Sequence, residues 1–284
     1  MKLSSTLKLS LLLLLSLTYL VANQKATDAK IIAHQTGVME ANQNIKLKSI
    51  AIAKSKPVPN MKDWRAYTLE MSVEYRNRDI DVNEIVFSNG TLITSELYHM
   101  DRKTSIKDDF TSSINEASYN KEHLLAGNIN ASHKLVVFSD PLCPYCQRFI
   151  PELIEFTNAN KKDVALFYYG FPLVSIHPSA EKITKVALAA KQKKLLSFEQ
   201  VKSKIYKAKL PTNLTDDKAI ERTNDILGLK GDKRIKESDF DAKVNETYLG
   251  DLKLGKSLLV SGTPTLFVNG KKDSNRVLYK NIRK

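Results

Sequence analysis

The sequence predicts an α/β protein in which a small antiparallel-sheet unit precedes an α/β domain with a helical insertion. Three observations lead to this fold class. Residues 45–98 contain β-rich runs, residues 134–171 read strand–helix–strand, and residues 179–255 are helical in pattern. The chain has 284 residues, 42% of them hydrophobic, which is enough for one large or two medium domains with ordinary cores.

The first 22 residues have the composition of a secretory signal peptide. Lys2 and Lys8 make a basic start, a leucine-rich run extends to Ala22, and polar residues begin at Asn23. This order is typical of signal peptides. The uncharged run is shorter than the ~18 or more apolar residues of a membrane span. We therefore predict export with cleavage after Ala22, and an uncleaved membrane anchor is the alternative.

The first predicted domain, residues 23–108, is rich in strands. A helix is expected over residues 28–44. Residues 45–53 and 67–75 alternate apolar with polar or small side chains, as half-buried strands do. Residues 84–98 form two β-rich runs around an Asn-Gly turn, which indicates a hairpin.

A linker, residues 109–130, is expected to join the two domains. Its first part, residues 109–126, offers Asp109 or Thr111 as a helix cap and apolar residues for one helix face. We therefore predict a linker helix.

The second predicted domain, residues 131–284, begins with a buried strand at 134–138, a helix at 147–158 and another strand at 164–171. Helices follow as far as Gly255. The expected closing elements are a strand at 265–268, a turn at Asn269-Gly270 and a last strand at 277–279.

The only two cysteines, Cys143 and Cys146, flank Pro144 and Tyr145 where the predicted strand gives way to a helix. A bridge across two residues constrains little of the unfolded chain, so a structural role is a weak reason for the pair. The N–H groups and dipole of a helix N-terminus favour a thiolate on Cys143. Cys146, one turn further, can resolve a mixed disulfide, and Pro144 suits the first helical position. The spacing predicts a redox-active dithiol.

Zinc binding is the main alternative for this spacing. A structural zinc site needs four Cys or His ligands, but the sequence adds only five histidines without ligand spacing. The net charge is +13, and the basic residues are scattered rather than gathered into the patch that nucleic-acid binding favours. We predict no metal site, no cofactor and no nucleic-acid partner.

The segment VVFSDPLCPYCQRFIPEL resembles the active-site strand, turn and helix of the thioredoxin superfamily. Pro151 matches the proline that kinks this helix. Ser261–Thr265 is similar to the loop that carries a cis-proline, so the resemblance implies a cis bond before Pro264 and a client-binding role for Thr263 and Pro264. An ordinary proline at a strand start is the alternative.

Other residues near the dithiol carry weaker expectations. Val137 lies six residues before Cys143, where thioredoxins bury an acid. Asp140 is a candidate proton carrier, although capping of the loop is the favoured role. The segment 175–178, which contains His177, is similar to a segment of the Dsb proteins, a group within this superfamily. For His177 we favour a surface position where a helix begins over a position near the redox site. Tyr145 is expected to present its ring to clients and to tune Cys143, with packing as the alternative.

Within the superfamily the chain is most similar to bacterial periplasmic Dsb proteins of the DsbC/DsbG type. The Cys-Pro-Tyr-Cys tetrapeptide and Thr263 carry this resemblance, and residues 84–101 are similar to the hairpin of their cystatin-like dimerisation domain. The resemblance implies a periplasmic homodimer that isomerises or reduces disulfides of unfolded or misoxidised exported proteins. A DsbD-like or DsbB-like membrane partner would exchange electrons with it. A DsbA-like oxidase and a chaperone with a residual redox site are the alternatives.

Overall fold

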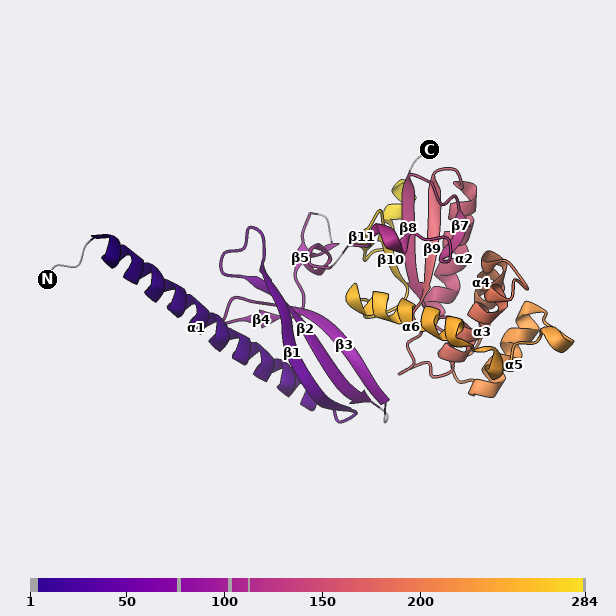
Figure 1. Cartoon of the computed structure of the whole chain (residues 1–284), viewed down its shortest axis with the longest axis horizontal. Coiled ribbons are helices and arrows are strands. Elements are labelled where there is room, and N and C mark those ends of the chain that lie inside the picture. Colours follow the sequence, from indigo (N-terminus) through magenta and orange to yellow (C-terminus); the bar gives the residue numbers. More distant parts are fainter. Residues whose placement is uncertain (1–4, 76–77, 102–103, 112, 283–284) are drawn as a thin grey trace. The chain divides into compact units, whose positions relative to one another are not determined.

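The structure is a computed structural model that describes residues 5–75, 78–101, 104–111 and 113–282, with only the backbone described for 5–22 and 78. The chain divides into two compact units, Met1–Leu97 and Tyr98–Lys284 (Figure 1), and each is described by itself. The side chains of the predicted signal peptide, residues 1–22, lie outside the described part. Searched over its described residues, the chain holds no helix with both the length and the apolar character of a membrane span.

The first unit combines one helix with an antiparallel sheet, as the sequence predicts. Helix α1 spans Ser5–Glu40 and so begins well before residue 28, where a helix was expected. The sheet has the strand order β1-β2-β3-β4, and all neighbouring strands are antiparallel. Its strands are β1 (Ile45–Pro57), β2 (Arg65–Tyr75), β3 (Arg78–Ser88) and β4 (Ile93–Thr94).

Alternating residues of β2 form the centre of this unit's core. Tyr67 and Leu69 are two positions apart, so their side chains project from the same face of the strand. They pack with Val86 of β3 and Ile31 of α1, and all four side chains are nearly or fully buried. The core therefore holds the helix on one face of the sheet.

The predicted hairpin is confirmed where β3 turns into β4. The side chain of Asn89 accepts hydrogen bonds from the backbone N–H groups of Thr91 (3.0 Å) and Leu92 (2.8 Å). These bonds satisfy the backbone of the turn, which is the reason that asparagine favours such positions.

The helix predicted over residues 109–126 is wrong. The described residues between 98 and 127 form short elements instead. They are β5 (Tyr98–His99), β6 (Thr104–Ser105), η1 (Ile106–Asp109), η2 (Glu116–Ser118) and β7 (Leu124–Gly127), where η denotes a 3-10 helix. The Ile114 N–H donates to the carbonyl of Gly270 (3.0 Å), and the Ile114 side chain is buried in the second unit. Contacts with distant residues therefore outweigh the local helical preference.

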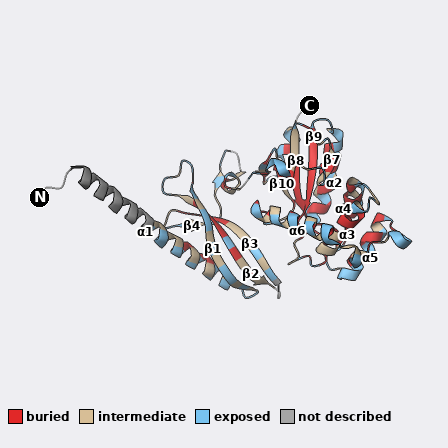
Figure 2. Cartoon of the chain, in the orientation of Figure 1, coloured by how far each residue is buried: buried red, intermediate tan, exposed pale blue. Residues whose placement is uncertain are grey.

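A five-stranded mixed sheet of order β11-β10-β8-β9-β7 forms the centre of the second unit. Figure 2 shows that its strands β8 and β9 consist largely of buried residues. Strands β8 (His133–Ser139) and β9 (Val164–Gly170) run parallel, and helix α2 (Pro144–Ala159) connects them. Strands β10 (Thr265–Val268), β11 (Lys271–Asp273) and β7 extend the sheet in antiparallel fashion. Every residue of β9 is buried, as expected of a central strand covered on both faces. The predicted strand–helix–strand is confirmed.

The two faces of β8 contribute to different cores because its side chains alternate. Leu135 and Val137 pack in one cluster with Cys146 of α2. Val136 and Phe138 pack on the opposite face in a second cluster. The second cysteine is thus part of the hydrophobic core beneath α2.

The helical insertion predicted between β9 and β10 is confirmed. Its helices pack around a cluster of their own. They are α3 (Ala180–Gln192), α4 (Phe198–Lys207), α5 (Asp216–Leu227) and α6 (Ala242–Ser257).

The predicted last strand at residues 277–279 is wrong. Strand β11 follows the Asn269-Gly270 turn directly, because this tight turn lets Leu266 pair with Asp273. Val277 is instead the N-cap of a 3-10 helix, η5 (Leu278–Asn281), to which Leu278 and Tyr279 belong.

Two glycines with similar backbones are expected to differ in their tolerance of a side chain. Gly127 has φ +81° and an added Cβ would lie 2.0 Å from the Val164 carbonyl oxygen, whereas Gly228 has φ +76° and open space. Gly228→Ala should lower the free energy of unfolding by roughly 1–2 kcal/mol through backbone strain. Gly127→Ala should lose about 1–3 kcal/mol more through overpacking. Urea unfolding measures both, and equal losses would contradict the placement of β7 against β9.

Candidate active site

The dithiol lies where strand β8 ends and helix α2 begins, as the sequence predicts. Cys143 is the N-cap residue of α2, and Pro144 occupies the first helical position. The Cys143 N–H donates to the Asp140 carbonyl (3.2 Å), which closes the loop between strand and helix. Both cysteines are free thiols, Cys143 being 5% exposed and Cys146 fully buried. Only the first sulfur is therefore open to attack from outside.

The two sulfurs have opposite acid–base properties. The hydrogen bond from the Cys146 side chain, with those from the backbone N–H groups of Cys146 and Tyr145, lowers the pKa of Cys143 to about 5 against the effect of burial. Burial raises the pKa of Cys146 far above its ordinary value, and the neighbouring Cys143 raises it further. At neutral pH, Cys143 is thus a thiolate and Cys146 a thiol, which is the division of roles that disulfide exchange requires.

The loop before β10 meets the first cysteine from across the sequence. The Thr263–Pro264 peptide bond is cis, which confirms the prediction for this proline. The Cys143 sulfur lies 3.3 Å from the Thr263 carbonyl oxygen. Because this carbonyl lies directly against the reactive sulfur, a chain bound along the loop would be adjacent to Cys143.

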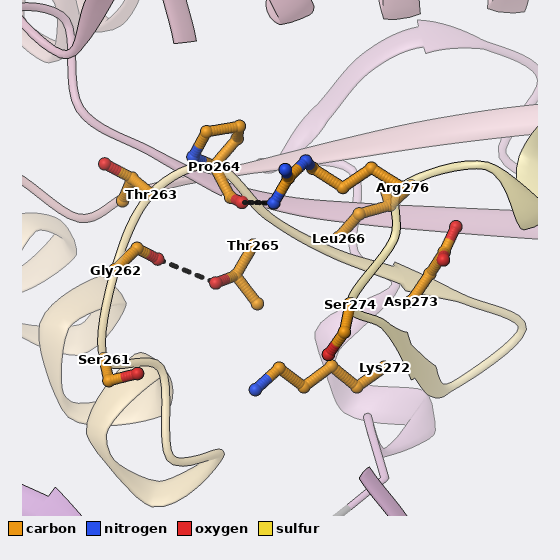
Figure 3. A pocket seen from close by; sticks show the side chains of 10 residues that line it. All are labelled: Ser261, Gly262, Thr263, Pro264, Thr265, Leu266, Lys272, Asp273, Ser274 and Arg276. Carbon is orange, nitrogen blue, oxygen red and sulfur yellow. Dashed lines mark hydrogen bonds between the residues drawn. The ribbon is translucent and has the colours of Figure 1, made fainter. Parts of the chain in front are cut away.

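A polar pocket of about 260 Å³ lies beside the cis-proline (Figure 3). Its lining includes Ser261–Leu266 on one side and Lys272 to Ser274 on the other. The Arg276 guanidinium donates to the Pro264 carbonyl oxygen at 3.4 Å. The Thr265 hydroxyl donates to the Gly262 carbonyl oxygen at 2.7 Å. These bonds fix the loop that carries Thr263.

Asp140 and His177 form a buried pair at the loop between β8 and α2. Asp140 is fully buried and accepts from the Leu142 N–H (2.7 Å), which confirms its predicted capping role. It also accepts from the Leu173 N–H (2.7 Å) and from His177 Nδ1 (2.9 Å). His177 is 7% exposed, so the favoured prediction of a surface position is wrong.

The charge state of His177 follows from these neighbours. The hydrogen bond with Asp140 raises the pKa of His177 above its ordinary value, and the negative charges of Asp140 and Cys143 act in the same direction. These neighbours therefore favour the protonated form of the imidazole. Thioredoxin-like sequence context, rather than local pattern, was the only signal that could have placed His177 beside Asp140.

Replacement of His177 by asparagine should lower the free energy of unfolding, and the size of this loss should depend on pH. Because the folded pKa lies above the unfolded value of about 6.5, the contribution of His177 is fully present below that value. It is lost as the pH rises through the raised folded pKa. His177→Asn should therefore cost about 1–3 kcal/mol at pH 5.5 and less at pH 9, by urea unfolding of both proteins. A loss that grows with pH would contradict the ion pair.

Three buried hydroxyl groups behind Cys146 were missed by sequence reasoning. Ser139 Oγ lies 2.7 Å from the Tyr206 hydroxyl, which lies 2.7 Å from the Tyr168 hydroxyl. No local pattern indicates this cluster, because its members come from β8, α4 and β9 and meet only in the folded chain.

Among the described residues, no group of three or more His, Cys, Asp or Glu side chains is placed to hold a metal ion.

The fold and the dithiol define the class of thioredoxin-fold thiol–disulfide oxidoreductases. The family model described as Thioredoxin matches residues 119–284, more than half of the chain. The chain belongs to the thioredoxin family. No curated protein matches it significantly.

Several solved structures are similar to the chain. Proteus mirabilis ScsC in a transitional conformation is 23% identical, with 62% of this chain and 80% of that chain covered and a TM-score of 0.48. A periplasmic thioredoxin-like protein from Salmonella enterica serovar Typhimurium is 24% identical, with 56% and 87% covered and a TM-score of 0.46. Oxidised BdbD from Bacillus subtilis is 17% identical, with 61% and 92% covered and a TM-score of 0.47.

Proposed function

We propose that the protein is an exported thiol–disulfide oxidoreductase that isomerises or reduces disulfides of other exported proteins, in the manner of DsbC and DsbG. The observation that carries the proposal is the Cys143 thiolate at the N-terminus of α2 with the buried Cys146 thiol behind it. A stabilised thiolate attacks, and the second thiol resolves.

The proposed reaction proceeds in two exchanges. The Cys143 thiolate attacks one sulfur of a client disulfide, forms the Cys143–client bond and releases the other client sulfur as a thiolate. In isomerisation, a client thiolate then attacks the mixed disulfide, re-forms a client disulfide and returns Cys143 as a thiolate. In reduction, Cys146 attacks Cys143, the two become a disulfide, and the Cys146 proton passes to the released client thiolate.

Client recognition is proposed to use two features beside the sulfur. The Thr263–Pro264 backbone lies against Cys143 and would bind an extended client segment. Tyr145 is 64% exposed, with the Arg148 guanidinium 5.3 Å from its ring centroid, and would present its ring to apolar client residues. Pro144 would keep the first turn of α2 in place.

The same proposal covers location and assembly. Residues 1–22 would direct export to the periplasm, and residues 23–108 would form a homodimer. Val38 and Leu92 in this region are 50% and 60% exposed and would be available to such an interface. A monomeric mass of the chain lacking residues 1–22, measured by light scattering, would contradict dimerisation.

One observation favours an oxidase as the second candidate. Stabilising the Cys143 thiolate favours the reduced form, which makes the corresponding disulfide a stronger oxidant. A DsbA-like oxidase with a DsbB-like membrane partner would use this property, whereas an isomerase would be kept reduced by a DsbD-like partner.

The resting redox state of Cys143 and Cys146 in intact cells distinguishes the two candidates. Acid quenching followed by a thiol-reactive mass tag reports it. We expect mostly reduced cysteines, and mostly oxidised cysteines would favour the oxidase. A chaperone would be indicated instead if Cys143→Ser still suppresses client aggregation and the wild-type protein shows no exchange.

A further inference from the structure

We propose that the hydroxyl groups of Ser139, Tyr206 and Tyr168 are positioning groups that stabilise the Cys146 thiolate while it resolves the mixed disulfide. The inference rests on the proposed exchange function and deepens it. It identifies what supports ionisation of a thiol that lies in a hydrophobic core.

The need for such support follows from the burial of Cys146. Its side chain is fully buried and packs in the cluster that contains Val137, Tyr168 and Tyr206. A thiolate in apolar surroundings is unfavourable unless hydrogen-bond donors reach it. Val137 is itself fully buried and carries no acid–base group.

The hydroxyls form one connected chain. Ser139 is the last residue of β8, Tyr206 lies in α4 and Tyr168 in β9. The oxygen–oxygen distance is 2.7 Å in both links, from Ser139 to Tyr206 and from Tyr206 to Tyr168. All three residues are at most 1% exposed, so water does not compete for these bonds.

Cys146 packs with Tyr168 and Tyr206 in one cluster, and Ser139 continues the chain of hydroxyls from Tyr206. The Ser139 side chain and the Asp140 backbone N–H act to lower the pKa of Cys146, although burial dominates and raises it. Both donors come from the segment that ends β8, which is fixed by its sheet partners.

The chain can orient its hydrogens in two ways. The Tyr168 hydroxyl lies 3.4 Å from the Ser139 carbonyl oxygen, to which it can donate. In the mixed disulfide Cys143 is no longer a thiolate that accepts the Cys146 hydrogen, so the Cys146 thiol can donate to Ser139 and each hydroxyl can donate onward, ending at this carbonyl. When Cys146 is a thiolate, the three hydrogens can rotate so that Tyr168 donates to Tyr206, Tyr206 to Ser139, and Ser139 to sulfur. The reversal needs no movement of heavy atoms.

The resolving step is balanced without a net proton on the hydroxyls. The Cys146–Cys143 bond forms as the Cys143–client bond breaks, and the Cys146 proton ends on the released client thiolate. The hydroxyls stabilise the charge that develops on sulfur between these events. They are therefore positioning groups rather than proton acceptors.

Several charged or titratable groups lie around Cys146 and the three hydroxyls and would affect any pH profile. They are Cys143 at the N-cap of α2, Asp140 with its partner His177, Lys202 of α4 and Asp251 of α6. Lys202 is 2% exposed, with its ammonium 4.0 Å from the Tyr168 ring centroid, and burial lowers its pKa to about 7. A variant must therefore be compared with a matched control that keeps these groups.

Tyr206→Phe and Ser139→Ala in the full chain test the proposal, with Tyr169→Phe as the matched control. Tyr169 is also a buried tyrosine of β9, but its hydroxyl donates to the Ser118 carbonyl at 2.6 Å, away from the cluster. Each reduced protein is mixed with oxidised glutathione, quenched in acid at increasing times and weighed by mass spectrometry. This follows formation and decay of the Cys143–glutathione disulfide across pH 5–9.

We expect decay to slow about tenfold in Tyr206→Phe and in Ser139→Ala, since each interrupts hydrogen bonding toward a developing charge. Its pH midpoint should rise, while formation and the Tyr169→Phe control stay at wild-type values. Ser139→Ala is the smaller change, so it is the decisive variant. If its mixed disulfide decays at the wild-type rate with an unshifted pH midpoint, the inference is overturned while the proposed function stands. If oxidised glutathione leaves the wild-type protein with neither a mixed disulfide nor a Cys143–Cys146 disulfide, the proposed function is overturned and the inference with it.

Discussion

Cys143→Ser should lower the rate of disulfide reduction by ~10³-fold or more, because a neutral hydroxyl replaces the only accessible thiolate. Insulin reduction by dithiothreitol, followed by turbidity, measures the rate. The variant should keep its fold, since Cys143 is the N-cap of α2 without a side-chain capping bond.

Cys146→Ser provides the matched control for this loss. It keeps the attacking sulfur and removes the resolving one, so it should still react once with a disulfide. A Cys143→Ser protein that retained a tenth of the wild-type rate would contradict the assignment of the attacking sulfur.

Alkylation of Cys143 should reach half its maximal rate near pH 5, where its pKa lies. At pH 6 the thiolate fraction should be roughly 300-fold that of an ordinary cysteine of pKa ~8.5. Iodoacetamide labelling of the reduced protein, with the Cys143 peptide quantified by mass spectrometry, measures this profile.

Cys146→Ala tests the cause of the shift. The Cys146 side chain is the largest contributor to the low pKa of Cys143, so its removal should raise the alkylation midpoint. A wild-type midpoint near pH 8, or a midpoint that Cys146→Ala leaves unchanged, would contradict the hydrogen bond between the two sulfurs.

The parts of the fold that depend on local pattern could be predicted from sequence. The apolar run of β8, the Cys-Pro-Tyr-Cys turn and the periodic apolar residues of α2 all point to one strand–helix junction, and the structure confirms it. The cis bond before Pro264 was accessible through the family resemblance rather than through physics alone.

Two of the wrong predictions, the helix over residues 109–126 and the surface position of His177, share a physical cause. Residues 109–126 have a helical pattern, but the Ile114 N–H donates to the distant Gly270 carbonyl, and the Ile114 side chain packs in the core of the second unit. His177 resembles a residue at the start of a surface helix, but it is buried by a bond to Asp140, 37 positions earlier. In both cases tertiary contacts decide, and no window of local sequence contains them.

The central claim is that Cys143 attacks a client disulfide and Cys146 resolves it. The most direct measurement is the mass of Cys146→Ser after incubation with an oxidised client protein, quenched in acid. Because the chain has only two cysteines, any disulfide-linked adduct of this variant must be on Cys143. We expect a stable, dithiothreitol-sensitive adduct that wild-type protein does not accumulate. Absence of an adduct while Cys143 stays free to alkylate would contradict the claim.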